Sequence, residues 1–518
     1  MITTTTPSAG SPAAGAGTGG ARGMPDVPGL PEVAWRGVLG LAAGLVVLEL
    51  TLAARYGYHR DELYFMACAR HLAWGYVDQP PLVPAVARLS MALFGPTVVG
   101  LRFWAALGGG ATVVFTALMA RELGGSRRAQ LLAALAAATS VQVVATDHLL
   151  STAAFDLFFW SATTLLVLRL LRTADTRLWL AIGAVAGVGL LNKYNIGFLL
   201  VAVVTGLLLD HRAALVFNRY AVMGALVALA IWTPNLIWNA QHHWAAFSML
   251  QALRQENSTL GASIGFIPTQ LVIVGPVLLP VWFGGLRDLF RHPWARSVAF
   301  AYATLVVVYT LSGAKPYYLG GAYFVLLAAG GIWADRRLTR SVSRLGRILA
   351  WILIGEALAI GFALPVRPVG DLAKGPSEAK LDKDLSATVG WNRVVAQLAS
   401  IADHLPPAER ARLVIYTGDY GAAGAVDRYG GDYGLPHAIS GHNNYWWWGP
   451  GASPNDSTTI AVNLDRAYLQ TIFGSVVPAG AVDTGHGVWS EELGDPIWIC
   501  RQQKRTWAQA WPAARHYG

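Results

Sequence analysis

Three carboxylates stand close together in a chain that is otherwise strongly apolar. Asp61 and Glu62 occur in the run Tyr-His-Arg-Asp-Glu-Leu-Tyr-Phe, and Asp78 follows in Gly-Tyr-Val-Asp-Gln-Pro-Pro. A carboxylate at a membrane surface can take a proton from an attacking hydroxyl group, and partial burial raises its pKa. We interpret residues 55–97, which contain all three acids, as the catalytic outer loop of an integral-membrane enzyme.

Each acid also has a plain structural explanation. Asp is a preferred helix N-cap, so Asp61 could cap a helix that begins at Glu62. Asp78 precedes a pair of prolines, which fix an extended backbone, so it could simply occupy a turn. The residue types leave both interpretations open.

Other charged residues are expected at or inside the membrane. Asp156 lies roughly two turns into the predicted span Leu149–Leu168, where an acid must face the bundle interior. Lys193 and Lys315 lie at span ends on the same side as the acids. An ammonium there could bind a phosphate as a point charge, or could snorkel to the lipid headgroups. His242, next to another histidine, could bind a metal or belong to an interfacial belt.

The composition indicates a membrane protein. Of 518 residues, 54% are hydrophobic and 13% are charged, whereas soluble proteins carry about 25% charged residues. The net charge is +9, but the basic residues are spread over short loops, so nucleic-acid binding is not indicated. Residues 1–31 are rich in Thr, Ser, Ala, Gly and Pro and are expected to form a disordered cytoplasmic tail. Cys68 and Cys500 could form a bridge or remain separate thiols.

About eleven apolar stretches are long enough, or nearly so, to span a bilayer. They are Val38–Ala54, Val98–Ala120, Ala129–Ala145, Leu149–Leu168, Leu178–Leu191, Ile196–Leu209, Ala221–Trp238, Ile264–Phe283, Val298–Leu311, Tyr317–Trp333 and Ile348–Leu364. Alternate loops between them are rich in arginine, as the positive-inside rule requires of cytoplasmic loops. This pattern predicts a multi-pass protein of the plasma membrane, in which the transmembrane domain covers residues 32–365. The N-terminus would be cytoplasmic and the loop of residues 55–97 would lie outside.

The composition becomes mixed and polar after Pro365. Residues 366–518 are expected to form a soluble extracytoplasmic α/β domain with a partly parallel sheet. Strands are predicted at Leu413–Tyr416, Thr458–Asn463 and Pro496–Cys500, and a helix at Ala422–Tyr429. A polar and aromatic cluster, His437 and His442 to Trp448, suits either sugar rings or docking onto the membrane interface.

The motifs keep the order found in one known family. Asp61-Glu62 with Tyr64, the Gly-Tyr-x-Asp-x-Pro-Pro run around Asp78, and the acid Asp156 come first. The later motifs are Leu-Asn-Lys-Tyr at Lys193, Pro-Asn-Leu-Ile-Trp-Asn before His242, and Lys-Pro-Tyr-Tyr at Lys315, Tyr317 and Tyr318. Over about residues 35–450 the chain resembles bacterial members of glycosyltransferase family 39. These are related to protein O-mannosyltransferases and to the aminoarabinose transferase of lipid A.

The resemblance implies a GT-C fold and an inverting sugar transfer on the extracytoplasmic face. The donor would be a polyprenyl-phosphate-linked sugar, and the acceptor a hydroxyl of a lipid, a glycan or a protein. Asp61 would be the general base, with Glu62 as its catalytic neighbour. The candidates for binding the donor phosphate are Lys193, Lys315, Arg70, His71 and His242, and the candidates for support or acceptor binding are Tyr64, Asp78, Asp156, Tyr317 and Tyr318. Some members of the family use a divalent cation.

Two other functions compete with this one. A transporter or flippase for a lipid-linked sugar would carry matched broken helices in two halves, which the sequence does not display. A membrane scaffold that binds glycan through its outer domain would not need the loop acids.

Overall fold

The computed structural model describes residues 29–257, 260–338, 360–372 except 362, 375, 379–485 and 487–517. The predicted tail of residues 1–31 lies almost entirely outside these residues. Most of the predicted span Ile348–Leu364 lies outside them as well.

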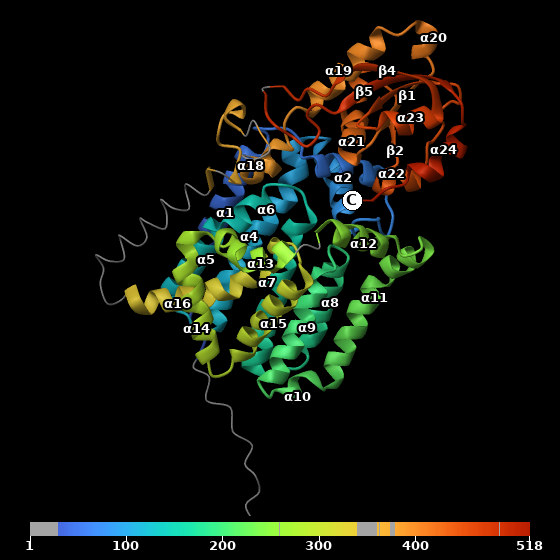
Figure 1. The fold of residues 1–518 in the computed structure, drawn as a ribbon. Coiled ribbons are helices and arrows are strands. Elements are labelled where there is room, and N and C mark those ends of the chain that lie inside the picture. Colours follow the sequence, from blue (N-terminus) through green and yellow to red (C-terminus); the bar gives the residue numbers. More distant parts are fainter. Residues whose placement is uncertain are drawn as a thin grey trace, which may run out of the picture.

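A helix bundle occupies residues 35–338 (Figure 1). Its first half consists of α1 (Trp35–Leu52), α2 (Arg60–Arg70), α3 (Leu82–Phe94), α4 (Val98–Glu122), α5 (Arg127–Thr139), α6 (Val141–Asp147), α7 (Thr152–Thr173) and α8 (Leu178–Leu190). Its second half consists of α9 (Asn195–Leu209), α10 (Ala213–Val216), α11 (Arg219–Gln241), α12 (Ala245–Asn257), α13 (Leu260–Ile273), α14 (Leu279–Arg291), α15 (Arg296–Ser312) and α16 (Tyr323–Leu338).

Several of these helices can cross a membrane. In the described part of the chain, five are long and apolar enough, and there are seven spans if each of two bent pairs counts as one. The shorter apolar helices α3, α8, α9 and α15 accompany them. The multi-pass helical architecture is therefore confirmed, whereas the number of eleven spans stays a prediction.

Two predicted spans are broken. The stretch Ala129–Ala145 divides into α5 and α6, which bend by 52°. Ser140 lies at this bend, and its side chain accepts a hydrogen bond from Val143 N, which caps α6. The stretch Ile264–Phe283 bends by 89° at Gly275 and Pro276. Gly275 has a φ of +95°, which ends α13, and Pro276 has no N–H to continue it.

Small residues let the helices of the bundle approach closely. Gly183 of α8 faces the backbone of Gly224 in α11, and any added Cβ would collide with the Gly224 carbonyl. Such contacts are typical of membrane bundles, where small residues bring backbones together.

Buried ion pairs tie the arginine-rich helix ends together. Glu122 at the end of α4 is buried and pairs with Arg169 and Arg172 of α7, both at 2.7 Å. Asp210 after α9 pairs in the same way with Arg212 at 3.0 Å and with Arg296 of α15 at 2.6 Å. The arginines used to predict the topology therefore also join neighbouring helices.

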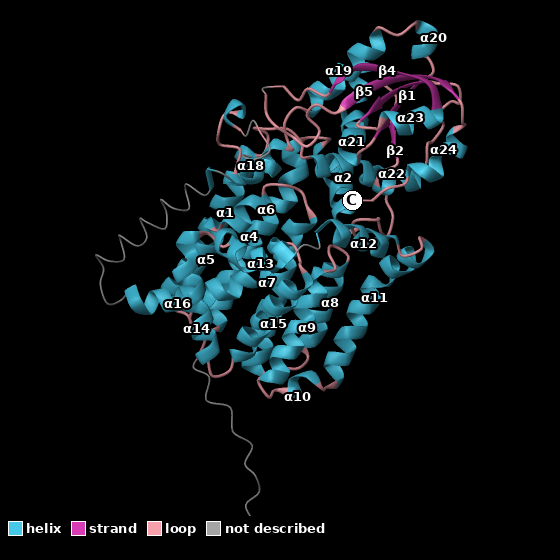
Figure 2. Ribbon diagram, in the orientation of Figure 1, coloured by secondary structure: helices cyan, strands magenta, loops and turns pink. Residues whose placement is uncertain are grey.

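A five-stranded sheet forms the core of the C-terminal part, which we call the sheet unit (residues 391–517; Figure 2). Its strands are β1 (Leu413–Thr417), β2 (Ala438–Ser440), β3 (Thr458–Val462), β4 (Phe473–Ala481) and β5 (Pro496–Gln503). Helices α19 (Trp391–Asp403), α20 (Pro407–Arg410), α21 (Tyr420–Tyr429), α22 (Asn443–Trp448), α23 (Arg466–Ile472) and α24 (Trp507–Ala514) accompany them, and α18 (Ala379–Ser386) precedes the unit.

The sheet is partly parallel, as predicted. Its order is β2-β1-β3-β5-β4, in which β1 runs parallel to β2 and β3 while the other pairs are antiparallel. The three predicted strands are present as β1, β3 and β5. Neither β2 nor β4 was predicted, because β2 is only three residues long and β4 contains glycine and proline, which are depleted in strands.

The sheet unit packs onto the bundle through α2 and α21, which lie side by side (Figure 1). Gly424 of α21 is so close to Leu63 of α2 that an added Cβ would lie 2.8 Å from the Leu63 carbonyl carbon. Buried residues of both parts, such as Trp160 and Trp391, belong to one continuous hydrophobic core. The unit therefore holds a fixed position over the loop that carries Asp61 and Asp78.

Candidate active site

The helix α2 presents Asp61 in its first turn. The N-cap is His59, whose side chain accepts a hydrogen bond from Asp61 N at 3.2 Å. The Glu62 side chain in turn accepts from His59 N at 2.8 Å, which completes a capping box. The interpretation that Asp61 caps a helix beginning at Glu62 is therefore wrong, because His59 is the N-cap, and the Asp61 carboxylate is left for other contacts.

Glu62 is fully buried and held by several donors. Its Oε1 accepts from Arg102 Nε at 2.8 Å and from Leu150 N at 3.0 Å, and its Oε2 accepts from Arg102 Nη2 at 2.7 Å. Arg102 in α4 is itself 2% exposed. With both oxygens occupied and no access to solvent, Glu62 is placed to anchor α2 to the bundle rather than to exchange protons with a substrate.

Asp61 contacts the sheet unit. Its Oδ1 accepts a hydrogen bond from the Tyr420 hydroxyl at 2.8 Å, and Arg60 Nε lies 3.8 Å from the same oxygen. Oδ2 accepts no hydrogen bond from any residue that the structure describes, and the side chain is 41% exposed. Asp61 thus keeps one solvent-accessible carboxylate oxygen, as a proton acceptor requires.

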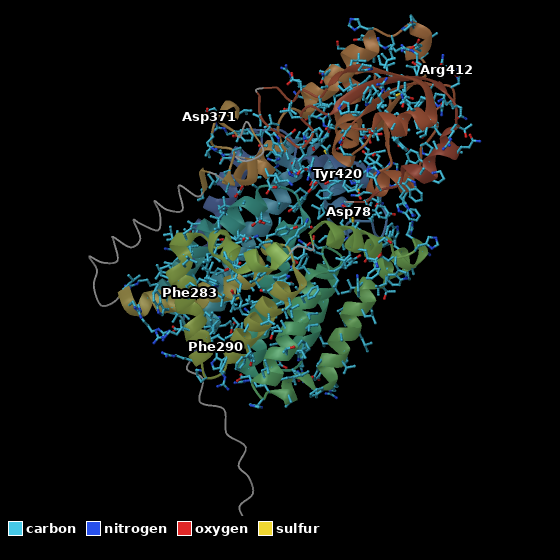
Figure 3. All side chains as sticks on the ribbon, in the orientation of Figure 1. Asp78, Phe283, Phe290, Asp371, Arg412 and Tyr420 are labelled. Carbon is cyan, nitrogen blue, oxygen red and sulfur yellow. The ribbon has the colours of Figure 1, made fainter. Side chains whose placement is uncertain are left out.

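Asp78 lies close to Tyr64 and Tyr420 (Figure 3). Its Oδ1 accepts from the Tyr64 hydroxyl at 2.8 Å, and the Tyr64 ring lies 4.9 Å from that of Tyr420. Asn444 of α22 supports this loop by accepting from Val77 N at 2.7 Å. Burial raises the pKa of Asp78 to about 7, with the Tyr64 hydrogen bond opposing the rise and the Asp61 charge adding to it. Asp78 therefore titrates near neutral pH.

Lys193 lies over two tyrosine rings rather than among lipid headgroups. Its Nζ is 4.8 Å from the ring centre of Tyr317 and 4.5 Å from that of Tyr318. Lys315 begins the Pro-Tyr-Tyr turn and lies within electrostatic range of Lys193. The ammonium group of Lys193 therefore faces an aromatic floor formed by Tyr317 and Tyr318.

Asp156 completes this part of the site from α7. It is buried, accepts from Asn195 Nδ2 at 2.7 Å and lies within electrostatic range of Lys193. Asn195 also donates to the Tyr318 carbonyl at 3.0 Å, which fixes the tyrosine turn. Asp156 faces the bundle interior as predicted, but it lies about one turn into its helix, not two, because α7 begins at Thr152.

The acids and the lysines share one region. The Tyr317 hydroxyl lies within electrostatic range of Asp61, while its ring lies under Lys193. Asp78 and Lys315 are both exposed to solvent, although protein surrounds Asp78 on most sides. Tyr317 therefore connects the carboxylate of Asp61 to the ammonium group of Lys193.

Three other predicted residues lie elsewhere. Arg70 and His71 are at the far end of α2, where Arg70 donates to the Asp427 carbonyl at 3.0 Å and His71 stacks on Trp448 at 4.5 Å. His242 stacks on Trp238 at 4.0 Å. No described contact brings any of the three to Lys193, so they are weaker candidates for the donor phosphate.

The sequence interpretation missed Tyr420 and left Asn444 without a defined role. Tyr420 follows the carboxyl end of β1. Ligands usually bind at this edge of a parallel sheet, so the position of Tyr420 after a predicted strand could have indicated a functional role. Asn444 was noted only as one of a polar and aromatic cluster. Cys68 and Cys500 are both buried and free, so they form no bridge.

In the described residues, no group of three or more His, Cys, Asp or Glu side chains could hold a metal ion.

The site can be compared with known proteins. Residues 78–238 match the family described as dolichyl-phosphate-mannose-protein mannosyltransferase. The lipid A galacturonosyltransferase RgtD of Rhizobium johnstonii is 26% identical over 249 residues, which is 46% of this chain and 50% of that protein. The matched segment thus spans about half the length of this relative.

The fold is that of a solved glycosyltransferase. ArnT from Cupriavidus metallidurans bound to undecaprenyl phosphate superposes with a TM-score of 0.63 at 15% identity, over 89% of this chain and 97% of ArnT. Its apo state gives 0.60 at 16% identity, over 89% and 96%. The fold that the resemblance implies is therefore confirmed, and part of the chain matches a glycosyltransferase family in sequence.

Proposed function

We propose that this chain, which resembles the GT-C glycosyltransferases, transfers a sugar from a polyprenyl-phosphate donor to a hydroxyl acceptor in the membrane. The observation that carries the proposal is the Asp61 carboxylate. Tyr420 holds one of its oxygens, the other accepts no hydrogen bond from the described residues, and Tyr317 connects it to Lys193. Such a transfer needs two groups, a base and a cation that binds phosphate, and Asp61 and Lys193 are the candidates for them.

The proposed step is a single displacement that inverts the anomeric centre. The acceptor oxygen attacks the anomeric carbon and loses its proton to Asp61 Oδ2 as the bond from that carbon to the phosphate oxygen breaks. The polyprenyl phosphate leaves with the electron pair, and the ammonium groups of Lys193 and Lys315 stabilise its charge. One carboxylate suffices because the phosphate is already a good leaving group.

The remaining residues would position these groups. Tyr420 fixes the rotamer of Asp61, the aromatic floor of Tyr317 and Tyr318 orients Lys193, and Glu62 anchors α2 through Arg102. Asp78, with a pKa near 7, contributes a second negative charge beside the site when it is ionised. The arginine-rich loops favour placing the site outside the cytoplasm.

Reconstituted protein given radiolabelled polyprenyl-phosphate sugars and a membrane and cell-wall extract would test the proposal. Label that moves onto an acceptor only when protein is present supports a transferase. Label that stays on the lipid but crosses the bilayer would indicate a flippase. An isolated sheet unit that retains glycan, without transfer by the whole chain, would indicate a scaffold.

A further inference from the structure

A cavity that does not include Asp61 or Lys193 lies between the bundle and the sheet unit. It has a volume of about 280 Å³, near the lower end of ligand pockets, and therefore suits a sugar residue better than a lipid. Its polar and aromatic wall is formed by His242, His243, Trp447, Arg515, His516 and Tyr517. The facing helix α12 contributes small side chains, including Ser248.

The groups on this wall are basic and aromatic. It combines an arginine and three imidazoles with two aromatic rings, and no acidic residue is among the described residues that line it. Arg515 forms no ion pair with any carboxylate in the described part of the chain, and its guanidinium group lies 5.9 Å from the Tyr517 ring centre. Guanidinium groups bind phosphate and carboxylate oxygens, and aromatic faces suit sugar rings.

Hydrogen bonds and ring contacts hold the side chains of this wall in place. Trp447 Nε1 donates to the Tyr517 hydroxyl at 3.2 Å, and the His242 ring meets Trp447 edge-on at 4.9 Å. His516 lies within 2.7 Å of the Gly418 carbonyl through Nε2, which holds its ring in place. Residues of α11, α22 and the segment after α24 are thus fixed around one space.

The cavity is connected to the candidate base. The His516 ring stacks on His442 at 4.6 Å, His442 lies 4.8 Å from Tyr420, and Tyr420 donates to Asp61. A group held in the cavity is therefore separated from Asp61 by three side chains. An acceptor anchored there could present another of its residues to the base.

From these observations we infer that the cavity binds a negatively charged sugar residue of the acceptor, one that carries a phosphate or a carboxylate. The inference rests on the proposed function, because it names the class of acceptor for the same site. It also assigns His242 to the acceptor side, away from the donor phosphate.

Binding of small probes to the full-length protein in detergent tests the inference without any donor. Calorimetric titrations with glucose 6-phosphate, glucuronate and glucose should give binding of the two anionic sugars and at least tenfold weaker binding of glucose. Arg515→Gln should weaken the anionic probes at least tenfold, and Ser248→Trp, which fills the cavity, should abolish their binding. Arg505→Gln removes the same charge from an exposed position outside the cavity and should change nothing.

One further variant separates this cavity from the proposed donor site. Lys193→Met should leave probe binding intact. Loss of binding in this variant would mean that the probes occupy the proposed donor site. Equal binding of glucose, or loss of binding in Lys193→Met but not in Arg515→Gln, would overturn the inference.

Transfer assays keep the two proposals apart. If the chain transfers sugar while Arg515→Gln keeps both wild-type probe binding and the wild-type KM for acceptor, this inference fails and the proposed function stands. If probes bind in an Arg515-dependent manner but no donor supports transfer, only the proposed function fails.

Discussion

The Tyr420 hydroxyl donates a 2.8 Å hydrogen bond to Asp61 Oδ1 across the contact between the sheet unit and α2. The C-terminal part of the chain therefore takes part in the site directly. It holds one oxygen of the candidate base, while the other accepts no hydrogen bond from the described residues.

Tyr420→Phe removes this hydrogen bond and keeps the ring. Because a hydrogen bond to a charged group contributes about 1.5–3 kcal/mol, kcat should fall about 10- to 100-fold. The donor KM should not change, since Tyr420 does not touch the proposed phosphate site. Steady-state kinetics would measure both parameters. Tyr433→Phe, at an exposed tyrosine of the same unit, is the matched control, and a wild-type kcat in Tyr420→Phe would contradict a positioning role.

Lys193→Met should weaken donor binding. The substitution keeps the aliphatic contact with the tyrosine floor and removes the ammonium group, so the donor KM should rise on the order of 10- to 100-fold. Competition by undecaprenyl phosphate would report the same loss independently of catalysis. Lys504→Met changes a surface lysine whose Nζ donates to the Gln470 carbonyl and should behave as wild type. An unchanged donor KM in Lys193→Met would remove the lysine from the phosphate site.

Arg102→Met should destabilise the fold. It leaves the Glu62 carboxylate buried without its partner, and breaking a buried pair costs about 3–5 kcal/mol. Denaturant unfolding in detergent would measure the free energy. Arg127→Met breaks an exposed pair with Glu32 and should cost less than about 1 kcal/mol. If the two variants were equally stable, Glu62 would not be an anchor.

The pH dependence of transfer should report Asp78. Its pKa of about 7 means that the carboxyl is protonated below neutral pH and ionised above it. The ionised form adds a second negative charge beside the reacting sugar, where positive charge develops in the transition state, so kcat should increase as pH rises through about 7. In Asp78→Asn this increase should disappear and the rate should stay low. A wild-type pH profile in the variant would assign the titration to another group.

Stability should depend on pH through Asp495. Burial, aided by the charges of Asp419 and Glu492, raises its pKa from an ordinary 3.8 to about 7. The folded state therefore binds this proton more tightly than the unfolded state, so the stabilisation is complete below about pH 4 and is lost as pH rises to about 7. Asp495→Asn should flatten the fall in melting temperature between these values. An identical fall in the variant would exclude Asp495 as the cause.

The sequence was most informative where a residue type was rare. Asp61, Asp78, Asp156 and Lys193 could be singled out because a charge in an apolar chain has few explanations. The bundle could be predicted because long apolar stretches fit the hydrocarbon interior of a membrane. Breaks such as that at Gly275 were missed because window averages do not register a single backbone conformation.

The partners of these residues could not be predicted. Tyr420 lies 359 positions after Asp61 and Asn444 lies 367 positions after Val77, and tyrosine and asparagine occur in many other places. Glu62 was grouped with the catalytic acids because its partner, Arg102, is hidden in an apolar helix 40 positions away. The packing of the sheet unit and of α4 against α2 reveals that Glu62 is buried in an ion pair while Asp61 is partly exposed.

The most direct measurement compares sugar transfer by wild type, Asp61→Asn and Asp403→Asn in the same reconstituted system. Asp403 forms a surface pair with Arg410, so its variant controls for the loss of one carboxylate charge. Undecaprenyl phosphate binding, measured in parallel, establishes that each variant is folded. We expect Asp61→Asn to bind the lipid normally and to transfer at least 100-fold more slowly, while Asp403→Asn matches wild type. Transfer by Asp61→Asn at the wild-type rate would contradict the assignment of Asp61 as the base.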